Sequence, residues 1–344
     1  MMQHEIVKQA PLLDEQGNVR EAGYAKKLLP IYNRQDIKAN SLRIKEWDYY
    51  LVCNDHHAVA LTVSDISYLG FDSISFLNFD ECWYETKGTM QIMPMGKKNL
   101  PSSSEEGDVE VGNSKYRIKF SHQNGKRILD FHMERFSNEK PITGQIILTD
   151  EPEESMVIVT PFHKKAHFYY NQKINCIRAE GTVTVNRKEY IFNPGESFAV
   201  LDWGRGVWTY KNTWYWGSAS GLANGVPFGF NIGYGFGDTS AATENMLFYN
   251  GKAHKLSNVY WHIPVNDKGK EEYLKPWTFT SDDGRFEMEF QPILDRASCI
   301  NAIVIKSDQH QVFGRFSGKA ILDDGKEILV KNLTGFAEKV YNRW

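Results

Sequence analysis

The sequence predicts an all-β protein in which short antiparallel strands close into two tandem β-barrels with little helix. Three observations lead to this prediction. From Ser41 onward, runs of four to ten residues alternate apolar with polar side chains, the two-residue period of a strand. Asn-Gly and Asp-Gly pairs, which are strong hairpin signals, separate several of these runs. About 300 residues of such strands suffice for two barrels of roughly 150 residues each.

The chain of 344 residues divides into an N-terminal extension and the two expected barrels. The extension covers residues 1–40, the first barrel residues 41–190, and the second barrel residues 191–344. The polar stretch at residues 96–113, rich in Ser, Gly and Lys, is expected to be a surface loop between strands. Hairpin turns are expected at Asn124-Gly125, Asn250-Gly251, Asp283-Gly284 and Asp324-Gly325.

Charge balance and cysteine spacing argue against several classes of partner and cofactor. With 40 Lys and Arg against 43 Asp and Glu, the net charge of −3 predicts no nucleic-acid-binding surface. The four cysteines have no short spacing, which predicts reduced thiols and a cytoplasmic protein. No run approaches the roughly 20 apolar residues of a membrane span, and no signal-peptide pattern opens the chain. We therefore expect no membrane span, metal or cofactor.

The segment "FAVLDWGRGVWTYKNTWYWGSASG", residues 198–221, is the first candidate for a functional site. Asp202 lies there among large apolar side chains. They would remove water from its carboxyl, and this desolvation would raise the pKa of Asp202 and let it donate a proton near neutral pH. If Arg205 is its ion-pair partner, Asp202 instead stays ionised. A pocket and a purely structural ion pair are both open. The aromatic residues expected at this site are Trp203, Trp208, Tyr210, Trp214 and Trp216.

A strand in the first half of the chain carries polar residues with a two-residue period. In "YYNQKIN" this period places Asn171, Lys173 and Asn175 on one face of the strand. That face points either to solvent or into the cavity of the first barrel. In the second case Lys173 would bind an anion or a carbonyl group.

The segment "GFNIGYGFGD", residues 229–238, places glycines 229, 233, 235 and 237 on one strand face together with Asn231. A face without side chains either lets another element approach closely or leaves room for a ligand. Asp238 and Glu244 lie just beyond this strand, and with Asp202 they supply up to three carboxylates. An Asp-Thr-Ser stretch is also typical of turn hydrogen bonding.

Several landmarks along the chain resemble known families. The segment from Phe168 to Trp208 is similar to the lipocalin-like superfamily of carotenoid 1,2-hydratases and AttH-type proteins. The hydratases place two residues between acid and tryptophan, whereas Asp202 and Trp203 are adjacent here. Over nearly the full chain the sequence resembles the bacterial DUF2804 family, which implies two lipocalin-like β-barrels. The landmarks are "KEWDYY" (45–50), "DWGRGVW" (202–208), "GFNIGYGFGD" (229–238), "ENMLFYNGKAHKL" (244–256) and "GFAEKVYNRW" (335–344).

Three functions stay open at this point. The first is a lipocalin-like enzyme that hydrates, cyclises or isomerises an apolar small molecule, with Asp202 as proton donor, Arg205 and Lys173 as orienting groups, and tryptophans stabilising a cation. The second is a non-catalytic binder of an apolar or amphipathic small molecule. The third is a carbohydrate-active hydrolase that pairs Asp202 with Asp238 or Glu244.

Overall fold

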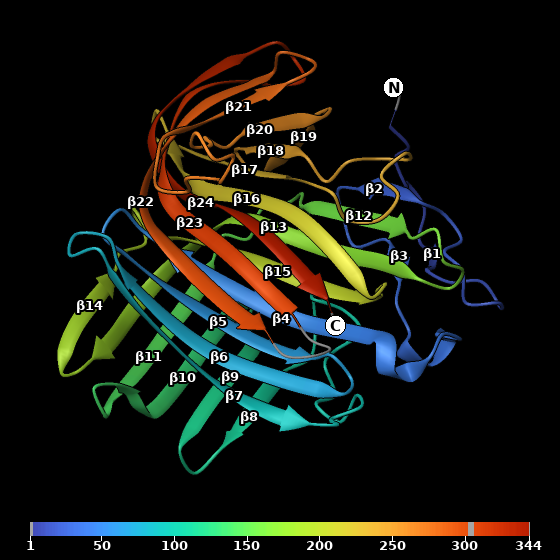
Figure 1. The fold of residues 1–344 in the computed structure, drawn as a ribbon, viewed down its shortest axis with the longest axis horizontal. Coiled ribbons are helices and arrows are strands. Elements are labelled where there is room, and N and C mark those ends of the chain that lie inside the picture. Colours follow the sequence, from blue (N-terminus) through green and yellow to red (C-terminus); the bar gives the residue numbers. More distant parts are fainter. Residues whose placement is uncertain (1–2, 302–305, 344) are drawn as a thin grey trace.

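The computed structural model describes residues 3–301 and 306–343, which form antiparallel sheets almost throughout (Figure 1). The all-β prediction is therefore confirmed. The helical elements in these residues are two single 3-10 turns, Arg34–Asp36 and Ser41–Arg43. Within the same ranges, no helix has the length and apolar character needed to cross a membrane.

The first sheet contains thirteen strands. Ten of them follow the order β7-β6-β5-β4-β15-β13-β11-β10-β9-β8, while β12 and β14 pair with β13, and β2 pairs with β12. The strands are β2 (Gly23–Ala25), β4 (Ile44–Cys53), β5 (His57–Asp65), β6 (Leu69–Asn78), β7 (Trp83–Ile92), β8 (Val109–Asn113), β9 (Tyr116–Gln123), β10 (Lys126–Ser137), β11 (Lys140–Thr149), β12 (Met156–Pro161), β13 (Phe168–Val185), β14 (Lys188–Phe192) and β15 (Phe198–Val207).

The second sheet contains nine strands in the order β19-β18-β17-β16-β24-β23-β22-β21-β20. A separate parallel pair joins β1 (Ala10–Pro11) and β3 (Pro30–Ile31) in the N-terminal segment. The strands of the second sheet are β16 (Lys211–Ala223), β17 (Val226–Tyr234), β18 (Met246–Tyr249), β19 (Lys252–Lys255), β20 (Val259–His262), β21 (Trp277–Ser281), β22 (Phe286–Asn301), β23 (Lys306–Ile321) and β24 (Glu327–Arg343).

The four predicted hairpin turns lie where the sequence places them. They join β9 to β10, β18 to β19, β21 to β22 and β23 to β24. At Asn124-Gly125 both residues have positive φ, of 52° and 74°. Two successive positive φ angles are typical of the type I′ turn, whose twist matches that of the strands it connects.

The passage from one sheet to the other falls between β15 and β16. Strand β15, residues 198–207, is paired with β4 on one side and β13 on the other, so it belongs to the first sheet. The first sheet thus continues beyond residue 190, where the sequence predicts the second barrel to begin. The N-terminal segment also joins this sheet, because β2 pairs with β12.

Each sheet curls around its own apolar core, and the outer faces of the two sheets pack against each other. One core lies inside the first curled sheet and a second inside the other. Two further clusters join the sheets, and one of them brings Tyr49 and Leu51 of β4 against Phe313 of β23 and Phe336 of β24. In Figure 1 the orange and red strands β22–β24 accordingly lie over the blue strands β4–β6. The surface between the sheets is called the junction below.

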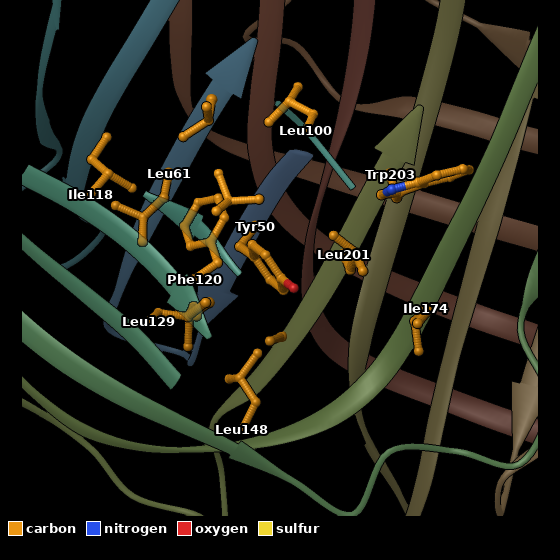
Figure 2. Packing of buried hydrophobic residues seen from close by; sticks show 14 of the residues in the cluster. Tyr50, Leu61, Leu100, Ile118, Phe120, Leu129, Leu148, Ile174, Leu201 and Trp203 are labelled. Carbon is orange, nitrogen blue, oxygen red and sulfur yellow. The ribbon is translucent and has the colours of Figure 1, made fainter. Parts of the chain in front are cut away.

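The stretch at residues 96–113 is only partly the surface loop that was predicted, because residues 105–108 are exposed, residues 109–113 form β8, and Leu100 and Ser104 are buried. Leu100 is buried in the first core, where Figure 2 shows it close to Tyr50 and Trp203. The Pro101 carbonyl accepts a hydrogen bond from Arg205 Nη2 at 2.7 Å, and the Ser104 carbonyl accepts one from Arg127 at 2.6 Å. Buried arginines must find acceptors inside the protein. Pro101 and Ser104 supply them, which explains why this part of the stretch folds inward.

Candidate functional site

Three side chains of the first sheet form a row that faces the second sheet. Tyr49 of β4 is the register partner of Asp202 in β15, and Asp202 is the register partner of Lys173 in β13. Directly opposed residues of antiparallel strands have Cβ atoms about 5 Å apart and lie on the same face. Antiparallel pairing therefore places a phenol, a carboxyl and an ammonium group side by side.

A second row, from the second sheet, faces the first. Gln311 of β23 is the register partner of Glu338 in β24, which is the partner of Trp216 in β16. The rings of Tyr49 and Trp216 meet edge to face with centroids 5.9 Å apart. Lys173 Nζ lies 4.3 Å from the centroid of the Trp216 ring. The site is thus built from two facing rows, one from each sheet.

Lys173 lies at the centre of the charged groups. Its Nζ is 3.3 Å from Asp202 Oδ1 and 3.8 Å from Glu244 Oε2. It also donates to Asn171 Oδ1 at 2.9 Å and to the Tyr169 hydroxyl at 3.3 Å. The lysine side chain is only 3% exposed, against 10% for Asp202 and 11% for Glu244. Buried charges persist in proteins when they are paired and hydrogen-bonded in this way.

Glu244 reaches the cluster because a glycine leaves room for it. A Cβ atom on Gly233 would lie 2.5 Å from Glu244 Oε1. Asn231 holds the same segment by donating to the Glu244 carbonyl at 2.8 Å, while its Oδ1 accepts from Trp216 Nε1 at 2.7 Å. Burial raises the pKa of Glu244, and the nearby Lys173 ammonium opposes this rise.

Glu338 is the second buried acid of the junction, and the sequence did not single it out. Its Oε1 accepts from Trp214 Nε1 and its Oε2 from Gln311 Nε2, both at 3.0 Å. Burial raises the pKa of Glu338 to about 7, although the Trp214 hydrogen bond works in the opposite direction. Both protonation states of Glu338 are therefore populated near neutral pH.

Asp202 has one bound and one unbound oxygen. Oδ1 accepts from Asn171 Nδ2 at 2.5 Å and lies against the Lys173 ammonium. No donor in the described part of the chain forms a hydrogen bond to Oδ2. Asp202 is therefore ion-paired with Lys173, and not with the Arg205 that the sequence offered as a partner.

The Asp202–Arg205 ion pair, one of the two alternatives that the sequence left open, does not form, because the two residues lie on opposite faces of β15. Arg205 is fully buried on the inner side of the first sheet, where its Nη1 is 2.9 Å from Asp48 Oδ1. Trp203 points the same way, and Figure 2 shows it among the residues of the first core. Three positions along a strand reverse the side-chain direction. The side chains of Arg205 and Trp203 thus point away from the junction cluster, which Trp203 reaches only through its carbonyl, an acceptor from Asn171 Nδ2 at 2.9 Å.

The polar face of β13 has a different environment from either of those expected. Asn171, Lys173 and Asn175 do share one face, but that face is buried against the second sheet. Asn175 Nδ2 donates to Ser218 Oγ of β16 at 2.8 Å. The face points neither to solvent nor into the first barrel, because the second sheet covers it.

The glycine face of β17 is filled by neighbouring elements. Besides Gly233 under Glu244, a Cβ atom on Gly229 would lie 2.7 Å from the sulfur of Cys176 in β13. Strand β17 ends at Tyr234, so Gly235 and Gly237 lie in the following turn and do not share this face. Close approach is the outcome here, which is one of the two explanations offered for a bare strand face.

Trp208, Trp214 and Trp216 form an aromatic wall of the junction. Phe236 meets the rings of Trp208 and Trp214 with centroids 4.7 Å and 5.5 Å away, and Trp208 also meets Trp47 at 5.2 Å. Rings packed edge to face in this way exclude water, and an aromatic ring face attracts a positively charged group of a ligand.

Two predicted site residues lie outside this wall and outside the charged cluster. Tyr210 is 40% exposed and its ring is covered by the Arg43 guanidinium at 5.4 Å. Asp238 accepts a hydrogen bond from the Ser240 backbone at 3.0 Å, which is the turn role that its sequence context also suggested. The carboxyls gathered at the junction are therefore Asp202, Glu244 and Glu338.

Sequence analysis missed Tyr49, Gln311 and Glu338. Tyr49 belongs to the landmark "KEWDYY" and Glu338 to "GFAEKVYNRW", which were used only for the family resemblance. The signal that could have found Glu338 is its position between Phe336 and Val340, where the two-residue period of a strand puts an acid on the same face of the run as two large apolar side chains. An ionisable group in such a run is buried at a cost and so points to a special environment.

Comparison with known proteins gives a family and a fold. The family model described as "Domain of unknown function (DUF2804)" matches residues 3–344. Among solved structures, an AttH-like protein of Nitrosomonas europaea aligns with a TM-score of 0.57 and 13% identity, over 96% of this chain and 98% of that chain. Kievitone hydratase of Nectria haematococca aligns with a TM-score of 0.50 and 11% identity, over 97% and 98%. Curated proteins yield no match. Identities this low show the lipocalin-like fold alone.

Proposed function

The chain belongs to the DUF2804 family, and we propose that the junction of this member is an acid–base site that acts on an apolar small molecule. The observation that carries the proposal is the group of three buried carboxyls at the junction, two of which lie 3.3 Å and 3.8 Å from the Lys173 ammonium, with the Trp216 ring against Lys173 and Trp214 donating to Glu338. Burying such a group is costly for the fold, and perturbed acids in aromatic surroundings are typical of catalytic sites.

We assign the acid role to Glu338 and the base role to Asp202. A general acid works best when its pKa lies near the working pH, and burial raises the pKa of Glu338 to about 7. Asp202 is ion-paired with the Lys173 ammonium, and its Oδ2 accepts no hydrogen bond from the residues that the structure describes. Pairs of acids in unlike environments take unlike roles. This assignment replaces the expectation that Asp202 donates the proton.

The reaction class is the addition, loss or shift of a proton at an unsaturated carbon skeleton. Acid-catalysed hydration, cyclisation and isomerisation pass through a carbon that gains positive charge, which carboxylates and aromatic faces stabilise. The hydratase among the structural neighbours has the same fold, and its name supports this class.

The test is ligand capture by an inactive variant. We expect Glu338→Gln, purified from a cell extract, to retain a small molecule that mass spectrometry identifies and that the wild-type protein converts to a product. Glu327→Gln, at an exposed position of the same strand, serves as the control and should behave as the wild type. A compound bound unchanged by all three proteins would support a binder and overturn the proposal.

A further inference from the structure

Two polar atoms of the facing rows have unused hydrogen-bonding capacity. Tyr49 Oη and Gln311 Oε1 are both buried, and neither has a hydrogen-bond partner within residues 3–301 and 306–343. The Gln311 amide approaches the Tyr49 phenol without reaching hydrogen-bond geometry. A buried polar group without a partner is costly, so such atoms need an explanation.

These two atoms have opposite hydrogen-bonding roles toward a ligand. The Tyr49 phenol offers a hydrogen, and its ionised form is excluded at neutral pH because burial raises its pKa to about 12. The Gln311 amide nitrogen is already used on Glu338 Oε2 at 3.0 Å, which leaves the amide oxygen as an acceptor. One donor and one acceptor are together satisfied by a hydroxyl group, which accepts from the phenol and donates to the amide.

The position of this pair is next to the two acids assigned above. Tyr49 is the register partner of Asp202, and Gln311 is the register partner of Glu338. The ring of Trp216 packs against Tyr49, so a group held there has an apolar wall on one side. A hydroxyl bound between Tyr49 and Gln311 therefore lies beside the Glu338 carboxyl.

From this placement we infer that the junction site takes an alcohol, held by its hydroxyl between Tyr49 and Gln311, and that the hydroxyl leaves as water. The inference rests on the proposed function. Glu338 gives its proton to the hydroxyl oxygen as the carbon–oxygen bond breaks. The Asp202 carboxylate takes a proton from the neighbouring carbon, whose carbon–hydrogen electrons form the double bond. Alcohol becomes alkene plus water, and the same steps reversed are a hydration.

A matched pair of probes tests the hydroxyl preference without any turnover. 1-Phenylethanol and acetophenone have nearly the same shape, but only the alcohol can donate to Gln311 Oε1. We expect the wild-type protein to bind the alcohol on the order of tenfold more tightly, measured by calorimetric or NMR titration. Gln311→Met, which removes the amide oxygen, should abolish this preference, whereas Tyr49→Phe should weaken the binding of both probes alike, because alcohol and ketone oxygens both accept from the phenol. Tyr260→Phe, at an exposed tyrosine, should retain it.

The outcomes separate this inference from the proposal on which it rests. Equal binding of both probes, tighter binding of the ketone, or failure to bind the alcohol would overturn the alcohol subsite. Loss of the preference in Tyr260→Phe would also count against it. In the capture experiment, substrate and product must differ by the mass of one water, and an isomeric pair would overturn the elimination step. A preference lost in Gln311→Met is independent of whether Glu338→Gln loses turnover, so either idea can fail alone.

Discussion

Glu338 owes its charge state to the way in which the two sheets meet. In the C-terminal part of β24, every second side chain points toward the junction, and the first sheet covers this face of the strand. Water that would hydrate a carboxylate is excluded, and two hydrogen bonds from Trp214 and Gln311 replace it only in part. The pKa of Glu338 accordingly rises to about 7.

This pKa predicts how stability depends on pH. The unfolded chain ionises Glu338 near 4.5, whereas the folded protein holds the proton up to about pH 7. Stability due to the raised pKa is therefore present below pH 4.5 and lost as the pH rises through 7. We expect Glu338→Gln, which cannot ionise, to gain on the order of 3 kcal/mol over the wild type between pH 4.5 and pH 8. Urea unfolding at several pH values measures this difference.

The exposed Glu327 of the same strand provides the control for that measurement. Glu327→Gln should follow the wild type at every pH, because its carboxyl stays in water in both states. A constant difference between Glu338→Gln and the wild type across this range would show that Glu338 titrates in the folded protein as it does in the unfolded one.

For single residues, the sequence predicts which face of a strand a side chain occupies, but not what covers that face. Alternation correctly placed Asn171, Lys173 and Asn175 together. The acids opposite them come from β24 and from the segment after β17, far along the chain. Asp202 and Arg205 could be separated by counting three positions along β15, and this count was available in the sequence alone.

Among the strands, the contact of β4 with β15 depends on a missing side chain. Trp47 of β4 lies directly over Gly204 of β15, its register partner. A Cβ atom on Gly204 would lie 1.9 Å from the Trp47 ring. The same ring stacks on Tyr169, a hydrogen-bond partner of Lys173. Displacing Trp47 therefore changes the surroundings of the site.

We predict that Gly204→Ala destabilises the protein by on the order of 1–3 kcal/mol, because the added methyl forces Trp47 out of its position. Gly195→Ala is the matched control, since a Cβ atom there meets nothing within 4 Å. The comparison requires urea unfolding of both variants together with their tryptophan fluorescence. Equal stability of the two variants would contradict the close-approach argument.

Strands joined by tight turns are the elements that the sequence predicts best. The turn at Asn124-Gly125 follows from two residues whose backbone preference is local. Within residues 96–113, the inward fold at Pro101 and Ser104 could not be predicted, because it depends on arginines of other strands that donate to these two carbonyls. A polar composition alone does not distinguish a solvated loop from one that satisfies buried arginines.

For the whole molecule, the family resemblance predicted the fold more completely than the residue patterns did. The curled sheets follow from alternation and turn chemistry, but their packing through outer faces does not. Phe336 of β24 shows why. It lies in the junction cluster and not in either sheet's inner core, and its ring meets Trp216 at 4.7 Å. Nothing in its local sequence distinguishes it from a residue of the inner core.

This position allows the coupling between the two sheets to be tested. We expect the wild type to unfold in one transition, because the two curled sheets share the junction clusters. Phe336→Ala removes a large ring from the junction and leaves both inner cores intact. The sheets should then unfold in separate transitions, seen as non-coincident curves for far-UV circular dichroism and tryptophan fluorescence.

Phe230→Ala distinguishes loss of coupling from simple loss of stability. Phe230 is as fully buried as Phe336, but it belongs to the inner core of the second sheet. Each substitution should cost about 3–5 kcal/mol in a well-packed environment. Coincident curves for Phe336→Ala would mean that the junction holds without this ring. If Phe230→Ala alone splits the transition, the cooperative unit is the inner core, and the junction is a contact between parts that unfold independently.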